Sequence, residues 1–123
     1  MSIIKLPIRY EGSKGEKVLA TTFGNGANYS CIQKKLMKGL GEMSQLRRTK
    51  IVSLSPDKNY EARQVACLDF TIDGITLSDE FMVVPDLEAP AIIGGLTLRK
   101  WRIQLDLEQE RVIVDPKVAK FRI

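Results

Sequence analysis

The sequence FGNGANYS, residues 23–30, joins two segments of different character and decides the fold. Before it, KVLATTF (residues 17–23) is rich in β-branched and aromatic residues, which is typical of a strand. After it, the apolar spacing from Ile32 to Leu40 predicts a short helix, with Ser30 as its cap. The glycines and asparagines between them tolerate positive φ angles, so the backbone can turn sharply. We therefore expect a tight loop between a strand and a helix.

A second decisive segment is AIIGGLTLRKW, residues 91–101. Its first three residues are apolar and predict a short buried strand, which Gly94 and Gly95 would end. The residues from Leu96 to Trp101 then predict a helical turn, with Trp101 in the core.

Together the two segments resemble the signature segments of the retropepsin-like aspartic proteases, the single-domain family that includes retroviral proteases. In that family the first segment reads apolar-apolar-Asp-Thr/Ser-Gly-Ala. Gly26 and Ala27 match it, whereas Gly24 stands at the Asp position and Asn25 at the Thr/Ser position. The second segment is similar to the hydrophobic-hydrophobic-Gly segment that packs under the catalytic loop. The resemblance covers most of the chain, from about Ile4 to Val114.

The rest of the sequence predicts an all-β protein. Short segments with alternating or continuous apolar residues are separated by turn residues such as Asp73-Gly74, which favours a barrel or sandwich. The expected strands cover residues 3–10, 17–23, 50–54, 60–72, 75–77, 81–84, 91–93, 103–107, 111–114 and 118–123. With the resemblance, the expectation is one domain over residues 1–123, a closed barrel of the retropepsin type with one or two short helices.

Aspartic proteolysis requires two carboxylates close enough to share one proton. The resemblance implies a homodimer in which each subunit would contribute one Asp at the two-fold axis, with the apolar chain ends interleaved between subunits. Because Gly24 stands at that position, both acids are absent and no catalytic residue is predicted. The remaining acidic residues do not lie in an apolar-Asp-Ser/Thr-Gly context, so the sequence offers no substitute.

The resemblance also implies a cleft for an extended peptide and a flap that closes over it. The cleft residues would be Gly24, Asn25, Gly26, Ala27, Asn28, Ile93 and Gly94. The flap would be the hairpin turn formed by Ser55, Pro56, Asp57, Lys58 and Asn59.

The sequence argues against several other kinds of catalytic, metal and cofactor site. The chain has no histidine, and its two cysteines, Cys31 and Cys67, do not form a CxxC pair. This composition excludes zinc sites built on Cys and His, and also Ser-His and Cys-His catalysis. We expect both cysteines to be buried, and we expect neither a metal nor a cofactor. Gly24-Asn25-Gly26 lacks the third glycine of a dinucleotide fingerprint, because Tyr29 occupies that place.

Three functions follow as hypotheses. The first is a catalytically silent homologue of an aspartic protease that binds extended peptides as a homodimer. The second is an active aspartic endopeptidase with an unrecognised acid, or an inactivated variant of one. The third is a non-enzymatic β-module whose basic surface binds an anionic partner, since the net charge is +4. The basic residues are scattered, so nucleic acid is the less favoured partner.

With no apolar run long enough for a membrane span and no recognisable signal peptide, the expected location is cytoplasmic.

Overall fold

The computed structural model describes residues 3–24, 26–55 and 58–119. The elements follow in the order β1 (Ile4–Glu11), β2 (Glu16–Phe23), β3 (Cys31–Gln33), the 3-10 turn η1 (Lys34–Met37), β4 (Ser44–Ser55), β5 (Lys58–Ile72), β6 (Ile75–Val84), β7 (Ala91–Ile93), α1 (Gly95–Lys100), β8 (Gln104–Asp106), β9 (Arg111–Ile113) and α2 (Pro116–Ala119). None of the helices in this described part is long and apolar enough to cross a bilayer.

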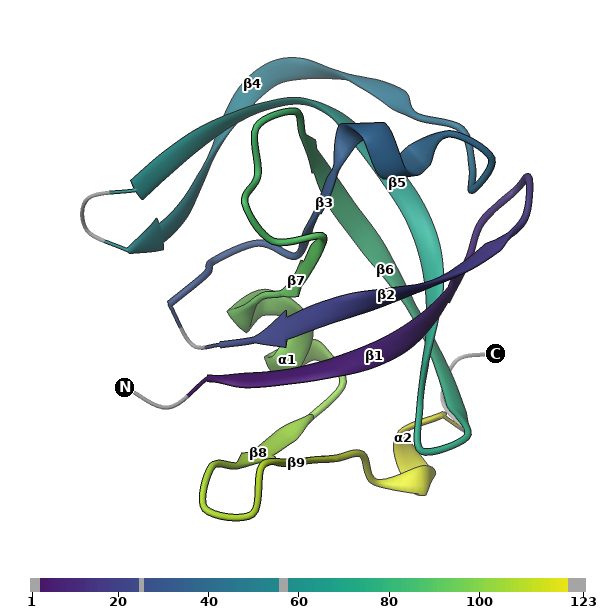
Figure 1. The fold of residues 1–123 in the computed structure, drawn as a ribbon, viewed down its shortest axis with the longest axis vertical. Helices are drawn as coiled ribbons and strands as arrows, with labels where there is room; N and C mark the ends of the chain where they lie inside the picture. Colours follow the sequence, from purple (N-terminus) through teal and green to yellow (C-terminus); the bar gives the residue numbers. More distant parts are fainter. Residues whose placement is uncertain (1–2, 25, 56–57, 120–123) are drawn as a thin grey trace.

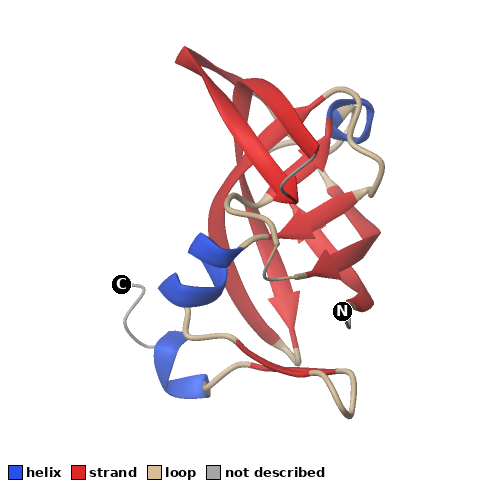
Figure 2. Cartoon of the chain, turned by 90° about the vertical axis from the view of Figure 1, so that its left-hand side faces the viewer, coloured by secondary structure: helices blue, strands red, loops and turns tan. Residues whose placement is uncertain are grey.

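Six of the described strands close into a barrel in the order β1-β2-β7-β3-β6-β5 (Figure 1). The closure is a short antiparallel pairing of Arg9–Glu11 on β1 with Asp69–Thr71 on β5. β4 pairs with β5 on its other edge and extends the sheet beyond the barrel. The predicted all-β closed barrel with short helices is confirmed. Figure 2 shows α1 and α2 near each other, with the β8–β9 hairpin at the end of the molecule away from β4.

β7 brings the two decisive sequence segments together. It pairs in parallel with the end of β2, where Thr21–Phe23 meets Ala91–Ile93, and antiparallel with β3 on its other side. The carboxyl ends of β2 and β7 therefore lie at the same edge, and the glycines that follow them are neighbours.

Two apolar clusters hold the barrel and the hairpin. In the larger cluster, the Phe81 ring makes edge-to-face contacts with Tyr10 and Phe70, at centroid distances of 5.6 and 5.8 Å. The Tyr10 hydroxyl hydrogen-bonds to Thr21 Oγ1 at 2.7 Å. The smaller cluster lies under the β4–β5 hairpin and includes Val52. Its burial fixes the hairpin above the loop that follows β2.

The turn that the sequence predicts at Asp73-Gly74 is confirmed. Asp73 and Gly74 both adopt positive φ, 50° and 77°, and connect β5 to β6 in the two-residue hairpin that the sequence indicates. The predicted helical turn near Leu96 is α1, and Trp101 is buried. β8 and β9 form the hairpin expected between residues 103 and 114.

The helix expected from Ile32 to Leu40 is wrong. Cys31–Gln33 instead forms β3, because it pairs with β6 on one side and β7 on the other. Only Lys34–Met37 makes a single 3-10 turn. Ser30 is not a cap: its hydroxyl accepts a hydrogen bond from the Gly94 N–H. Pairing within the sheet has overridden a weak helical pattern.

Other boundaries also differ from the predictions. β4 begins at Ser44 rather than residue 50, and the segments expected at 75–77 and 81–84 are one strand, β6. The extended segment expected from residue 118 is wrong at its start, since Pro116–Ala119 is α2, and its remainder lies outside the described residues. Cys31 is buried as expected, but Cys67 is exposed. The strand alternation explains this, because Ala66 and Leu68 on either side of Cys67 face the core.

Candidate functional site

Gly24 is the first residue after β2 and has open space around its α-carbon. A Cβ placed on it would meet no atom within 4 Å from the described residues beyond its chain neighbours, and its φ lies outside the left-handed region. The position can therefore hold a side chain without strain. Asn25, its neighbour in the predicted cleft, lies outside the described residues.

The segment after β7 is hydrogen-bonded to the loop between β2 and β3, which we call the glycine loop. The Gly95 N–H donates to the Ala27 carbonyl at 2.8 Å, and the Leu96 N–H donates to the Asn28 carbonyl at 3.2 Å. Gly94 lies directly against the backbone of Tyr29, since a Cβ at Gly94 would be 2.4 Å from the Tyr29 oxygen. This contact leaves no room for a side chain at Gly94, so its glycine is a packing requirement.

A chain of hydroxyl groups reinforces this junction. Thr97 Oγ1 donates to Asp79 Oδ2 at 2.7 Å and lies 2.5 Å from Ser30 Oγ. Because Thr97 has a single hydroxyl proton, Ser30 donates to Thr97, and Ser30 accepts from the Gly94 N–H at 3.0 Å. Asp79 also forms an ion pair with Lys100 at 3.3 Å. Sequence reasoning missed this network, because its members lie far apart in the chain and match no motif.

A pocket of about 300 Å³ lies between the glycine loop and the hairpin. The loop contributes the predicted residues Gly24, Gly26 and Ala27, and the hairpin contributes Lys58 together with residues that were not predicted. The complete lining is Ile3, Lys5, Thr22, Gly24, Gly26, Ala27, Leu54, Lys58, Tyr60, Glu88, Ala89 and Ile92. Most of these side chains are apolar, as is usual for a pocket that binds a ligand side chain.

The other predicted cleft residues have different positions. Ile93 is buried in the larger core, and Ile92 lines the pocket in its place. Gly94 lies beneath the loop, and Asn28 contacts the hairpin. Of the predicted flap, Pro56 and Asp57 lie outside the described residues, as does the Ser55 side chain. Asn59 accepts a hydrogen bond from the Ser53 hydroxyl at 2.9 Å and lies outside the pocket lining.

Asn28 fastens the hairpin to the loop with three hydrogen bonds. Its N–H donates to the Ser53 carbonyl at 3.3 Å, and its Oδ1 accepts from the Ser53 N–H at 3.0 Å. Its Nδ2 donates to the Ile51 carbonyl at 3.4 Å. Asn28 thus satisfies backbone groups on the edge of β4 that faces away from β5, and holds the hairpin over the pocket.

An ion pair closes the other side of the pocket. Lys58 Nζ lies 3.1 Å from both carboxylate oxygens of Glu88. The hydrogen bond and charge of Glu88 raise the pKa of Lys58 above its usual value. Among the described residues that line the pocket, Glu88 is the one acidic side chain, and it is paired with a lysine. Each copy of the chain thus offers this pocket one carboxylate among its described residues, and a lysine holds it.

We expect Asn28→Ala to loosen the hairpin. The change removes two side-chain hydrogen bonds to the β4 backbone, which is worth about 1 kcal/mol of local stability. Hydrogen exchange of the Ser53 amide should then accelerate roughly fivefold. The matched control is Asn59→Ala. It removes an Asn side chain from the same hairpin, where that side chain bonds to Ser53 and not to the glycine loop. Equal acceleration in both variants would contradict the fastening role of Asn28.

Comparison with known proteins supports the fold. No family model matches the sequence, and no curated protein matches it. A similar solved structure is the retroviral protease-like domain of Ddi1 from Leishmania major, with a TM-score of 0.65 and 16% sequence identity. The alignment covers 94% of this chain and 90% of that one. At this identity the likeness establishes the fold, and the chain is therefore a closed barrel of the retroviral protease-like type.

Proposed function

We propose that this protein is a catalytically silent homologue of the retropepsin-like aspartic proteases, and that it binds extended peptides as a homodimer. The observation that carries the proposal is Gly24. It follows β2, borders the apolar pocket and has open space, and these features support its assignment to the position where the family would hold an acid. Without a shared proton between two carboxylates, no water is activated for attack on a peptide bond.

The walls of the pocket suit an extended peptide. The glycine loop lies on one side and the β4–β5 hairpin on the other, with Leu54 and Tyr60 contributing from the hairpin. An extended chain between them could satisfy its backbone groups as an added strand, while its side chains enter the apolar pocket.

Exposed apolar residues beside the loop support a dimer. Ile3, on the pocket rim, is 53% exposed, and Leu96, whose N–H bonds to the loop, is 47% exposed. A second copy meeting this face would bury both residues, and a symmetric homodimer is the commonest way to do so.

A peptide library tests this function. We expect the protein to retain a subset of extended peptides and to cleave none of them at neutral or mildly acidic pH. Gly24→Leu should abolish retention by filling the pocket, whereas Gly24→Ala should preserve it. Cleavage at mildly acidic pH that a statine-type inhibitor blocks would overturn the proposed silence. Retention unchanged by Gly24→Leu would show that peptides bind elsewhere.

A further inference from the structure

The positive charge of the chain is concentrated in one segment. Residues 31–55 contain one acidic residue, Glu42, and carry a net charge of +5, so the remaining residues carry a net charge of −1. The basic residues of the segment are Lys34, Lys35, Lys38, Arg47, Arg48 and Lys50. The overall charge of +4 therefore comes from β3, η1 and β4.

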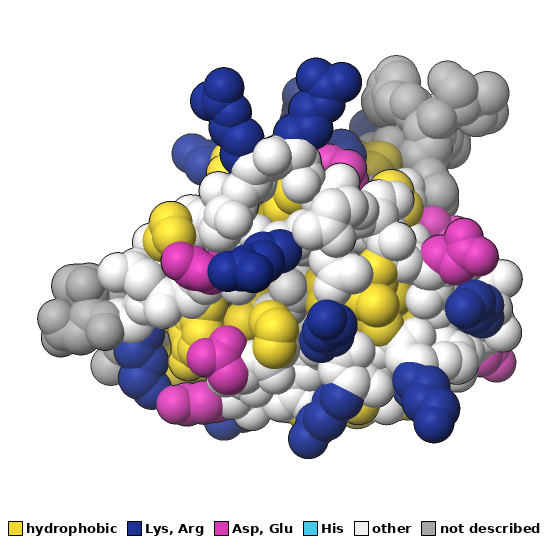
Figure 3. Space-filling model, turned by 90° about the horizontal axis from the view of Figure 1, so that it is seen from above, with side chains coloured by type: hydrophobic (Ala, Val, Ile, Leu, Met, Phe, Trp, Pro, Cys, Tyr) yellow, Lys and Arg dark blue, Asp and Glu magenta, His cyan; other side chains and the backbone are white. Residues whose placement is uncertain are grey.

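These charges are not neutralised in the described structure. All six side chains are exposed, and none forms an ion pair with another described residue. Lys50 is the one with another contact, since its Nζ lies 5.4 Å from the centre of the Tyr29 ring. Figure 3, which views the molecule from the side of β4 and η1, shows Lys and Arg side chains spread across this face, with Asp and Glu side chains at several places among them. The segment therefore gives this face an excess of positive charge.

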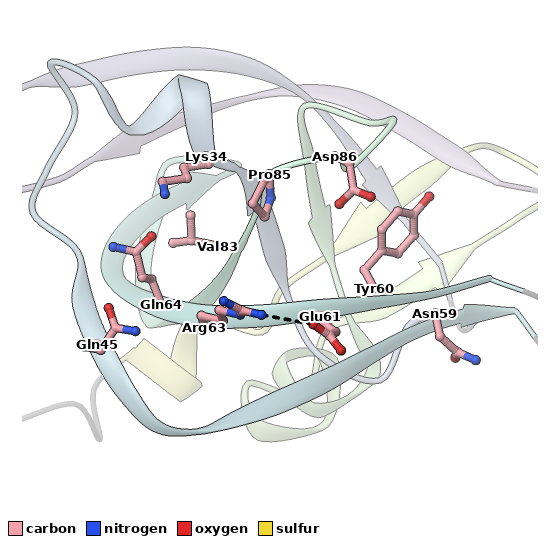
Figure 4. A pocket seen from close by; sticks show the side chains of 10 residues that line it. All are labelled: Lys34, Gln45, Asn59, Tyr60, Glu61, Arg63, Gln64, Val83, Pro85 and Asp86. Atoms are coloured by element: carbon pink, nitrogen blue, oxygen red, sulfur yellow. Dashed lines mark ion pairs between the residues drawn. The ribbon is translucent and has the colours of Figure 1, made fainter.

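A groove runs between these basic elements. Its volume is about 670 Å³, and η1, β4, β5 and the residues after β6 form its walls. Lys34 from η1 and Arg63 from β5 line it together with Glu61 and Asp86, and Arg63 forms an ion pair with Glu61 at 3.8 Å (Figure 4). Gln45 and Gln64, which are partners across the β4–β5 ladder, place two side-chain amides near them. A carboxylate at the η1 side of this groove could accept from Lys34, and the amides could pair with a peptide backbone.

Strand β4, which lies beside the groove, extends the sheet beyond the barrel. Between Gln45 and Lys50, four residues of β4 lie opposite Arg63 alone, so the ladder bulges there. The bulge contains Arg47 and Arg48, and residues 47–51 are all exposed. β4 is also the last strand of its sheet, so this part of its outer edge has no partner strand.

We propose that this basic face, defined as Lys34, Lys35, Lys38, Arg47 and Arg48, binds an extended acidic segment of a partner protein. The acidic side chains meet the unpaired cations, and the partner backbone lies along the groove and the bulged edge of β4. Single-stranded nucleic acid is less well matched, because binding it depends on stacked aromatic rings and Tyr60 is the one aromatic residue lining the groove. This site is separate from the pocket at Gly24 and does not depend on the function proposed there.

The test measures the binding of a fluorescein-labelled peptide with alternating Glu and Val by anisotropy at several salt concentrations. We expect the intact protein to bind this peptide, and to bind a Gln-for-Glu peptide at least about tenfold more weakly. Arg47→Glu with Arg48→Glu should weaken binding of the acidic peptide by a further factor of about ten or more. The matched control, Lys14→Glu with Arg99→Glu, makes the same change in net charge at exposed residues outside the face.

Four outcomes would overturn the proposal. The acidic peptide could fail to bind at low salt, or the Gln peptide could bind equally well. The control variant could lose as much affinity as the Arg47 and Arg48 variant, which would mean that net charge alone matters. A single-stranded oligonucleotide could bind more tightly than the acidic peptide with the same dependence on Arg47 and Arg48, which would assign the face to nucleic acid. Circular dichroism of each variant verifies that the fold is intact.

Discussion

Gly94→Val is expected to lower the free energy of unfolding by roughly 3 kcal/mol, at the upper end of the usual cost of overpacking. The added Cβ alone would be 2.4 Å from the Tyr29 oxygen, 2.5 Å from the Tyr29 carbonyl carbon and 2.9 Å from the Ser30 nitrogen. All three are backbone atoms, so no flexible side chain can move aside to relieve the contact. The junction between the glycine loop and β7 must separate, and the Ser30 hydrogen bond to Gly94 weakens with it.

Thermal unfolding measures this effect. A loss of 3 kcal/mol should lower the melting temperature by roughly 10 °C in a domain of this size. Gly24→Ala is the matched control, because its Cβ has open space and its backbone is compatible with alanine. We expect that variant to be unchanged, or more stable by up to about 1 kcal/mol. If both glycine variants unfold alike, the close contact at Gly94 is not what holds the two segments together.

Gly24→Asp combined with Asn25→Thr is expected to create peptidase activity. The open space at Gly24 accommodates the carboxyl group, and the proposed dimer would place two such groups close enough to share a proton. Cleavage of peptides that the unaltered protein retains should rise by at least about a hundredfold, the lower range for acid–base catalysis. The rate should fall at both acidic and alkaline pH, because one carboxyl must be ionised while the other is protonated.

The control for this gain is Gly24→Asn with Asn25→Thr, which has nearly the same shape without the acid. It should stay inactive. If the Asp variant is folded and dimeric but also inactive, the cleft differs from that of an active protease in more than its missing acid. That result would contradict the proposal that Gly24 occupies the position of the catalytic acid.

The sequence was most informative where local chemistry decides the structure. The turn at Asp73-Gly74, the strand before Gly24 and the helical turn after Gly95 depend on residues close in the chain, and all three have the expected form. The resemblance to retropepsin-like proteases also predicted the closed barrel. The predicted residues Gly24, Gly26 and Ala27 do line one pocket.

The sequence was less informative where distant segments compete. The local pattern predicts that Cys31–Gln33 is part of a helix, but pairing with β6 on one side and β7 on the other makes it a strand. The choice of Ile92 over Ile93 as a pocket residue depends on which face of β7 points into the larger core. Likewise, the hydrogen bonds between Asn28 and the edge of β4 join residues that are far apart in the chain. These assignments depend on tertiary pairing, which no local pattern encodes.

Cross-linking through Gly24→Cys reports on the proposed dimer, because two copies of the glycine loop would meet there at a two-fold axis. Cys67→Ser provides the background, since Cys67 is the exposed thiol in the described residues. Cys31 is buried, and burial raises its pKa to about 12, so it stays a neutral, unreactive thiol. Val18→Cys is the matched control, at an exposed position near the start of β2, the strand that Gly24 follows.

A disulfide forms only when the two α-carbons lie within about 7 Å of each other. We predict that mild oxidation converts the Gly24→Cys protein rapidly into a covalent dimer, while the Val18→Cys protein stays mostly uncrosslinked. The proposed dimer is ruled out if the Gly24→Cys protein is folded but does not cross-link faster than the control, or if the unaltered protein sediments as a strict monomer.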